Sequence, residues 1–329
     1  MNRVTLPIMV IFLAILACGQ TPPTTIPTPI ADRLSAIPAE AVKVTPADDF
    51  WPPSAATGWS QPVPMPGLVN TAGAEDSPFI TADGNDFYFF FTPDVRVPAE
   101  KQLLDGVTGI WIAHRNGDTW SEPARVRLEN PGTLALDGCE FVSGNLMYFC
   151  TTREGYTGIQ WFSADFKNGL WQDWQSAGNE LKQSEYQTGE LHISADGQEL
   201  YFHSARPGGS GGLDIWVSNK TASGWGEPAN LGPTINTAAD EGWPDISADG
   251  QELWFNGQST HGRPGPATFR SMRQPDGSWG QSEEIISTFA GEPSLSRDGK
   301  TLYFVHHYYS KDLTSMREAD IYVSNRLEP

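Results

Sequence analysis

Cysteine, basic side chains and long apolar runs are all scarce in this chain of 329 residues. Three cysteines are too few for a disulfide-rich scaffold or a zinc-cluster fold. Against 40 aspartate and glutamate residues stand only 21 lysine and arginine residues, so the formal net charge is −19. Such a field repels nucleic acids and anionic membrane surfaces. No apolar run reaches the roughly 18 residues that a membrane-spanning helix needs. We therefore expect neither nucleic-acid binding nor a permanent membrane span.

Residues 1–18 have the pattern of a secretory signal peptide. Arg3 supplies a positive charge, and the apolar stretch 6–17 is too short to cross a bilayer. The stretch leads into ILAC at positions 15–18, which resembles the lipobox of bacterial lipoproteins. That resemblance implies that Cys18 becomes the lipid-carrying N-terminus. An ordinary signal peptide with an incidental cysteine is the alternative.

The next segment, residues 19–56, is rich in proline and threonine and shows no sustained hydrophobic period. Proline keeps such a segment extended and prevents helix formation. We therefore predict three parts in the chain. A signal peptide occupies residues 1–18, an extended tether occupies residues 19–56, and one folded domain occupies residues 57–329.

The folded domain contains one sequence unit that occurs five times. Each unit has an apolar run, an Asp-Gly or Ser-Gly turn, and a second run that ends in aromatic residues. Asp-Gly between two such runs is a strong hairpin signal, because glycine accepts the positive φ of a tight turn. The five hairpins are SPFITADGNDFYFFF, DGCEFVSGNLMYFC, ELHISADGQELYFHS, WPDISADGQELWFNG and EPSLSRDGKTLYFVH, with turn glycines Gly84, Gly144, Gly197, Gly250 and Gly299.

A third strand follows each hairpin, and in all units but the last a fourth strand with a tryptophan motif follows it. The third strands are GIWIAHR, GIQWFSA, DIWVSNK, ATFRSMR and DIYVSNR. The missing tryptophan motif stands at the other end of the domain, around Trp59. This offset predicts a closed ring, which has no exposed sheet edges. The predicted fold class is all-β: a five-bladed β-propeller closed by an N-terminal strand that completes the last blade.

Two segments in the third and fourth units carry a family resemblance. GWGEPANLGPTINTAADEGWPDISADGQELWF and SARPGGSGGLDIWVSNK look like the WD40-like repeat of TolB-type propellers. The likeness covers residues 58–326 and is weakest in the first two units, where Ser143 replaces the turn aspartate and VRVPAEKQLLDGV is inserted. The resemblance implies an extracytoplasmic protein, often one that contacts proteins or the cell envelope. It implies no particular catalytic residues, because this fold hosts many activities.

The innermost strands of such a ring supply candidate site residues. Each begins at the mouth of the central channel, on the face opposite the Asp-Gly turns. We count six residues back from the aspartate of each turn, or from Ser143 in the second unit. This places the following residues at the mouth: Ser77, Asp137, Glu190, Trp243 and Glu292. The same face should carry nearby acidic residues and the loops between second and third strands. These add Glu75, Asp76, Asp240, Glu241, Arg153, Arg206, His261, Arg263, His306, His307, Tyr308 and Tyr309.

Three interpretations of this ring remain open. In the first, it is a non-catalytic binding face for an envelope protein or a glycan, and the ligand-binding candidates are Asp137, Glu190, Trp243, Glu241, Glu292, Arg153, Arg206 and His307. In the second, it is the site of a glycan-active hydrolase, in which two of Asp137, Glu190 and Glu292 act as acid and base. In the third, it is a solvated ring that holds water or Ca²⁺ through oxygen ligands.

Other residue patterns point away from metal chemistry. The adjacent His306 and His307 point to opposite faces of a strand, and no zinc-binding histidine motif is present. We predict no metal site and no required cofactor. The tryptophans that recur once per unit should pack between sheets, whereas Trp243, at a channel position, is a candidate ligand platform. The predicted protein is a monomeric lipoprotein of the bacterial cell envelope, outside the cytoplasm.

The two remaining cysteines fall within one predicted hairpin. If Gly144 and Asn145 form a two-residue turn, Ser143 pairs with Leu146 and Cys139 lies directly opposite Cys150. Outside the cytoplasm such a pair can oxidise. A disulfide and a pair of buried thiols are equally compatible with this pattern.

Overall fold

The computed structural model describes residues 32–130, 132–178, 181 and 188–328. The predicted signal peptide and its Cys18 lie outside these residues. The chain is nearly all-β, with 3% helix and 48% strand. The two α-helices in the described part, α1 (Arg33–Ala36) and α2 (Ala99–Gln102), are single turns. Neither is long enough to cross a membrane.

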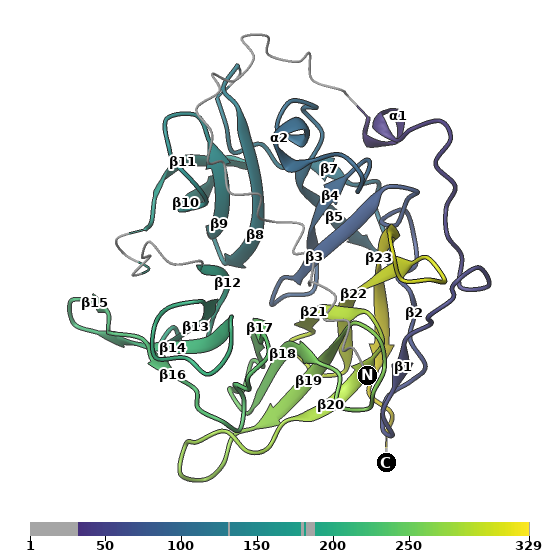
Figure 1. Cartoon of the computed structure of the whole chain (residues 1–329). Coiled ribbons are helices and arrows are strands. Elements are labelled where there is room, and N and C mark those ends of the chain that lie inside the picture. The colour runs from purple at the N-terminus through teal and green to yellow at the C-terminus, as the bar shows by residue number, and fades with distance from the viewer. Residues whose placement is uncertain (1–31, 131, 179–180, 182–187, 329) are drawn as a thin grey trace.

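The strands form successive antiparallel hairpins along the chain (Figure 1). The first two groups are β3 (Ala74–Ile80), β4 (Asp86–Thr92), β5 (Gly109–Asn116), β6 (Thr119–Trp120) and β7 (Ala124–Arg125), then β8 (Ala135–Ser143), β9 (Leu146–Arg153), β10 (Gln160–Lys167) and β11 (Leu170–Ser176). The third group is β12 (Thr188–Ile193), β13 (Glu199–Ser204), β14 (Asp214–Thr221), β15 (Gly224–Trp225) and β16 (Ala229–Asn230). The last two are β17 (Gly242–Ile246), β18 (Glu252–Gln258), β19 (Pro266–Met272) and β20 (Glu283–Ser287), then β21 (Ala290–Leu295), β22 (Thr301–Tyr309) and β23 (Met316–Asn325).

Hydrogen bonding within the described residues joins these groups into four sheets, the largest of nine strands. That sheet unites the first and last groups through one parallel pairing, Ala319 with Ala74. The first strand of every group lies nearest the centre of the molecule (Figure 1). Each of these inner strands contacts the next: β3 with β8, β8 with β12, β12 with β17, β17 with β21, and β21 with β3.

Two short N-terminal strands are added to the last groups. β2 (Val63–Pro64) pairs with β23, and Trp59 forms a further bridge to Arg326. β1 (Ser54–Ala55) pairs with β20. The N-terminal chain therefore lies on the outer edges of strands that follow it by more than two hundred residues.

The segment 32–56 differs from the free tether that its composition predicts. Arg33 is buried and pairs with Glu75, with Nη1 3.3 Å from Oε1. Further along, Asp49 pairs with His306 at 2.9 Å, and both side chains are inaccessible to solvent. Proline content predicts an extended chain without helix, whereas α1 lies at the start of this segment. Composition also does not predict whether the chain is free or docked. We call residues 32–56 the strap.

The recurring tryptophans pack between neighbouring sheets, as their spacing predicts. Trp59, Trp120, Trp171, Trp225 and Trp279 are all buried. The ring of Trp171 lies against Tyr88, that of Trp279 against Tyr201, and that of Trp59 against Trp254, each in the neighbouring group of strands. These residues therefore hold neighbouring sheets together.

The β8–β9 hairpin contains a disulfide between Cys139 and Cys150, whose Cα atoms are 5.3 Å apart. The two-residue turn and the Ser143–Leu146 pair occur as predicted. The direct pairing of the cysteines does not, because the register shifts between Gly138 and Phe141. Gly138 faces Cys150, and Cys139 lies in the bulge.

We expect the double substitution Cys139→Ser and Cys150→Ser to lower the free energy of unfolding by about 2 kcal/mol, because the cross-link restricts the unfolded chain. Urea denaturation of the oxidised protein and of this variant measures the difference. Addition of a reductant should bring the wild-type protein to the stability of the variant. Equal stability of the two proteins under oxidising conditions would contradict the prediction.

Candidate functional site

Every inner strand is interrupted at the same point. The pairing with the second strand shifts there in all five hairpins. The residue at the interruption has a positive φ, which is uncommon outside glycine. These residues are Ser77, Cys139, Glu190, Trp243 and Glu292. We call them the bulge ring.

Four members of the bulge ring are the residues predicted at the channel mouth. The second is Cys139 and not the predicted Asp137, which is a correction. The β8–β9 turn holds two residues between Ser143 and Leu146, whereas the other hairpins have a turn two residues longer. Counting six residues back from the turn therefore goes two residues too far in this unit.

Glycine before the bulge allows neighbouring side chains to approach closely. The bulge residue follows Gly138, Gly189, Gly242 or Gly291 in four units, and Asp76 in the fifth. A Cβ on Gly189 would lie 2.6 Å from Nε2 of His203, and one on Gly291 would lie 2.6 Å from Nδ2 of Asn256. The glycine that recurs in four units, followed after one residue by Pro244 or Pro293 in two of them, is a sequence signal that could have located the bulges.

Two of those neighbours hold the bulge backbone of the next group of strands. The backbone N–H of Trp243 donates to Nδ1 of His203 at 3.1 Å, and that of Glu292 donates to Oδ1 of Asn256 at 2.6 Å. Burial lowers the pKa of His203 to about 3. The ring is therefore neutral at physiological pH, with Nδ1 available as an acceptor.

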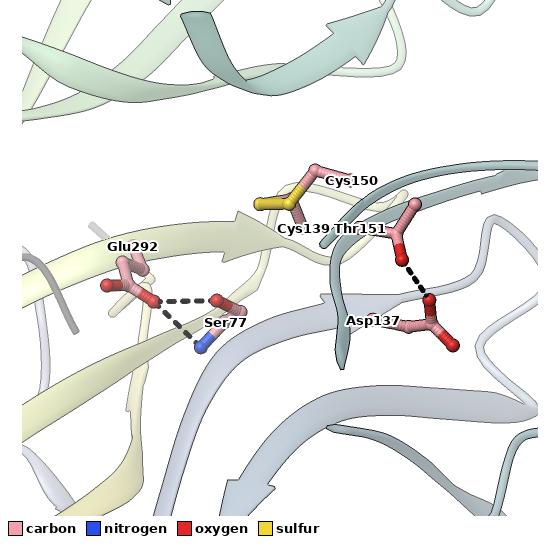
Figure 2. The surroundings of a disulfide bond; sticks show 6 residues. All are labelled: Ser77, Asp137, Cys139, Cys150, Thr151 and Glu292. Atoms are coloured by element: carbon pink, nitrogen blue, oxygen red, sulfur yellow. Dashed lines mark hydrogen bonds between the residues drawn. A yellow bond between two sulfur atoms is a disulfide. The ribbon is translucent and has the colours of Figure 1, made fainter. Parts of the chain in front are cut away.

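The bulge ring encloses a small acidic cavity of about 40 Å³. Its lining includes Ser77, Glu140, Glu190, Trp243 and Glu292. Oε2 of Glu292 accepts hydrogen bonds from the backbone N–H of Ser77 at 2.7 Å and from its hydroxyl at 3.1 Å (Figure 2). Glu140 is 6% exposed, and neither of its carboxylate oxygens accepts a hydrogen bond from another described residue.

Burial raises the pKa of three carboxyls that line this cavity, those of Glu140, Glu190 and Glu292. It raises the pKa of Glu140 to about 8 and that of Glu292 to about 7. The pKa of Glu190 is also raised, first by burial and then by repulsion from Glu292 and Glu140. Asp76 is buried beside the cavity, and its pKa is raised by burial and by the same neighbouring carboxylates. Sequence reasoning placed Asp76 near the mouth but missed Glu140, which stands where the other units have proline or leucine.

A second layer of side chains lies two residues beyond the bulge residue on each inner strand. Phe79 contacts Phe141, and Phe141 contacts His192, with ring centroids 5.4 and 4.9 Å apart. Nδ1 of His192 is 2.5 Å from Oδ1 of Asp245. The other oxygen of Asp245 accepts the backbone N–H of Leu295 at 2.8 Å.

The same layer continues from the last group of strands to the first. The hydroxyl of Ser294 accepts the backbone N–H of Ile80 at 3.1 Å. Contacts between neighbouring groups therefore run around the whole centre of the molecule.

Beyond this layer, on the side of the hairpin turns, lies a wider pocket of about 450 Å³. Its aromatic lining includes Phe79, Phe141, Phe166 and Trp171, and the exposed Arg297 stands at its edge. Pockets of about 300–1,000 Å³ with an apolar lining and a few polar groups are typical ligand sites. The sequence predicted a site on the opposite face, so this pocket was missed.

We call this wider pocket the turn-face pocket. The carboxylates that line it already have partners. Asp86 pairs with His114 at 2.6 Å, and Asp245 pairs with His192. Asp83 accepts the Thr81 hydroxyl at 2.7 Å within the turn. The pocket therefore presents aromatic faces and one arginine, and each of its carboxylates is engaged.

The other predicted site residues lie apart from both cavities. Oδ1 of Asp137 accepts hydrogen bonds from the Thr151 hydroxyl at 2.6 Å (Figure 2) and from Nη2 of Arg153 at 2.9 Å. Glu241 accepts the backbone N–H of Thr237 at 2.7 Å and its hydroxyl at 2.5 Å. These carboxylates hold loops in place.

Arg206 and His307, two more of the predicted ligand-binding residues, are also part of the protein's packing. The guanidinium of Arg206 lies over the rings of Phe202 and Trp216, 4.8 and 5.4 Å from their centroids. His307 donates its backbone N–H to the carbonyl of Phe289, and burial lowers the pKa of the His307 ring to about 4. Of the eight predicted ligand-binding residues, three line this small cavity: Glu190, Trp243 and Glu292.

No set of three or more histidine, cysteine, aspartate or glutamate side chains in the described part of the chain is arranged to hold a metal ion. A Ca²⁺ ion needs six to eight oxygens converging at about 2.3–2.6 Å. The carboxylates of the bulge ring gather around one cavity without converging in this way.

No family model matches the sequence, and no curated protein matches it. Among solved structures, TolB from Acinetobacter baumannii is similar at 14% identity with a TM-score of 0.42, over 79% of this chain and 56% of that one. The chain therefore spans little more than half the length of TolB. An α-L-arabinofuranosidase from Lactobacillus brevis is similar at 14% identity with a TM-score of 0.46, over 79% and 92%. An α-L-arabinofuranosidase catalytic domain from Coprinopsis cinerea is similar at 12% identity with a TM-score of 0.45, over 84% and 97%. These similarities do not assign a function.

Proposed function

We propose that the chain is a five-bladed β-propeller in which β2 completes the last blade. The nine-stranded sheet then comprises two blades joined by the single Ala319–Ala74 pairing. The ring of contacts between inner strands supports five blades. The pairing of Val63 with Val323 supports closure by the N-terminal strand.

We further propose that the protein is a monomeric, membrane-anchored lipoprotein that works outside the cytoplasm. The signal-like residues 1–18 and the cysteine at position 18 support export and lipidation. The Cys139–Cys150 disulfide supports an oxidising compartment, since such bonds are rare in the cytosol.

Its proposed role is that of a non-catalytic binding module for an envelope protein or a glycan. The observation that carries this proposal is the separation of two features that a hydrolase must combine. The turn-face pocket is wide enough for a ligand, and the carboxylates that line it are all partnered. Glu140, Glu190 and Glu292, whose carboxyl pKa values are raised, line a cavity of about 40 Å³, far below the size of a typical ligand pocket.

The second candidate is a glycan hydrolase that uses the carboxyls of the bulge ring. Glu292, whose pKa is raised to about 7, has the protonation that a general acid needs near neutral pH. This role requires the cavity to widen on substrate binding. Incubation of the protein with envelope glycans, followed by chromatography of the products, distinguishes the candidates, because released sugar would favour the hydrolase.

We expect a ligand of the turn-face pocket to stabilise the folded protein by about 2.7 kcal/mol at a hundred times its Kd. Melting curves of the whole protein against panels of oligosaccharides and envelope-protein peptides would measure this shift. Arg297→Ala, which removes the cation at the pocket edge, should weaken binding about tenfold. Lys311→Ala, which removes an exposed cation elsewhere, should leave binding unchanged. A shift that is the same in both variants would place the ligand outside this pocket.

A further inference from the structure

In four units a cation covers the recurring tryptophan, and the second unit departs from this rule. The charged group lies 4.3–4.8 Å from the indole centroid in these pairs: Arg115 over Trp120, Lys220 over Trp225, Arg273 over Trp279 and Arg326 over Trp59. Each cation is also the strand partner of its tryptophan. In the second unit the strand partner of Trp171 is Phe166, and the two ring centroids are 5.1 Å apart.

Phe166 is 39% exposed and, like Trp171, lines the turn-face pocket. Lysine and arginine cover an indole face while they keep their charge in water, so packing alone does not require phenylalanine at this position. Exposed apolar surface beside a pocket is typical of a contact with another molecule. The exchange of a cation for an aromatic ring therefore indicates a ligand contact.

The second and fifth units also depart from the repeat at this pocket. The residue before the turn aspartate is Ala82, Ala195 or Ala248 in three units and Arg297 in the fifth, and all four line the pocket. The shorter turn of the second unit contributes Asn145. Arg297 and Asn145 are exposed, and their side chains have no hydrogen-bond or ion-pair partner among the described residues. These polar groups are therefore available to a ligand.

His192 adds a third such group. Its Nδ1 is 2.5 Å from Oδ1 of Asp245, and its side chain is 17% exposed. Within the described part of the chain, Nε2 of His192 has no hydrogen-bond partner. Arg297 only donates hydrogen bonds, the Asn145 amide donates and accepts, and Nε2 does either according to the protonation of the ring. The turn-face pocket thus gathers three unengaged polar groups from three units around its aromatic lining.

We propose that the turn-face pocket binds a neutral oligosaccharide, with one sugar ring stacked on Phe166. This deepens the proposed binding function, in which it selects the glycan, and rests on it. A sugar hydroxyl both donates and accepts, so it suits arginine, the amide and either state of the imidazole. The C–H groups on a sugar face bury apolar surface against an aromatic ring.

Charge and polarity favour an uncharged sugar over the alternatives. The net charge of −19 repels acidic sugars. An apolar side chain of a partner protein could cover Phe166, but it would leave the three polar groups without partners, which lowers affinity. The pocket volume of about 450 Å³ lies within the range of small-molecule sites.

Calorimetric titration of the whole protein with four neutral oligosaccharides tests the proposal. The probes are cellohexaose, xylohexaose, mannohexaose and chitohexaose, and hexagalacturonate is the acidic arm. We expect at least one neutral probe to bind, and hexagalacturonate to bind at least about tenfold more weakly. If none of the four neutral probes binds, or if the acidic probe binds as well as they do, the proposal is overturned.

The matched variants exchange the cation and the aromatic ring between units. Phe166→Arg restores the residue type that covers tryptophan elsewhere, so it should leave the Tm unchanged and weaken sugar binding about tenfold. Lys220→Phe makes the opposite exchange in the third unit, on a side chain that does not line the pocket, and should leave binding unchanged. If Phe166→Arg does not fold, Asn145→Ala, on an exposed turn, replaces it and should also weaken binding.

Equal sugar binding by Phe166→Arg and Lys220→Phe would show that the sugar binds elsewhere and would overturn the proposal. A peptide that binds in an Arg297-dependent way, in the absence of sugar binding, would support the proposed function and exclude this inference. Sugar binding that is lost in both Phe166→Arg and Arg297→Ala, at unchanged Tm, would support both.

Discussion

Arg33→Ala is expected to lower the free energy of unfolding by about 3–5 kcal/mol at pH 9, because it leaves a buried carboxylate without its cation. The Arg33 side chain is 1% exposed and that of Glu75 is fully buried. Nη1 of Arg33 also donates to the carbonyl of Val69 at 2.7 Å, and Nη2 donates to the carbonyl of Leu68. The substitution removes all these contacts at once. Urea denaturation followed by tryptophan fluorescence measures the loss.

The aromatic surroundings of Arg33 add to this effect. Its guanidinium carbon lies 5.4 Å from the ring centroid of Phe91 and 5.5 Å from that of Phe89. Burial raises the pKa of Glu75 to about 8, against the opposing influence of Arg33. Glu75 is therefore largely protonated at pH 6, and the loss in Arg33→Ala should be smaller there than at pH 9.

Arg96→Ala is the matched control for this prediction. Arg96 pairs with Asp94 at 2.7 Å, but its side chain is 63% exposed. Exposed pairs contribute about 0–1 kcal/mol. A loss in Arg33→Ala no greater than that in Arg96→Ala would show that the strap does not stabilise the domain.

Glu140→Gln is expected to raise the free energy of unfolding by about 3 kcal/mol at pH 7, because it removes a carboxyl that resists ionisation in the folded state. Burial raises the pKa of Glu140 from its ordinary value of 4.5 to about 8. Between these two values the folded protein binds a proton that the unfolded chain releases. The penalty is absent below pH 4.5, grows as the pH rises, and is complete above pH 8.

The wild-type protein should consequently become more stable as the pH falls from 8.5 to 6.5. Glu292, whose pKa is raised to about 7, contributes in the same direction. Below pH 6.5 the buried rings of His203 and His307, whose pKa values are lowered, oppose this trend. Melting curves from pH 8.5 to pH 6.5 should show a rising Tm for the wild type and a flatter profile for Glu140→Gln. The Glu100→Gln variant, which removes an exposed carboxylate of α2, should follow the wild-type profile. A Tm of the wild type that falls between pH 8.5 and pH 6.5 would contradict the prediction.

The repeated hairpins show how far sequence patterns reach. The Asp-Gly and Ser-Gly turns have the positive φ that the pattern requires, 72° at Gly84 and 59° at Gly144. This works because a turn glycine, its flanking strands and their register are all local in sequence. The same locality predicted the Ser143–Leu146 pair and brought Cys139 and Cys150 close together.

The candidate site was predictable only in part, because its residues stand at bulges. A bulge adds one residue to a strand and so shifts which side chains face the channel. Strand alternation assigns every second side chain to the channel, and a bulge interrupts that alternation. Counting from the turn found Glu190, Trp243 and Glu292, where the hairpins share one length. It failed at Asp137, where the turn is two residues shorter, and it missed Glu140, whose role depends on the bulge at Cys139.

The sequence by itself determined the all-β class, the five repeated units, the turn positions and the tryptophans between sheets. These follow from local turn chemistry and from periodicity, which are encoded within each unit. Only the tertiary structure decided which carboxyls share one cavity, where the wide pocket lies, and how the strap docks. Those features join residues more than two hundred positions apart, such as Asp49 with His306 and Ser77 with Glu292. Charge and burial at such contacts depend on neighbours that no local pattern specifies.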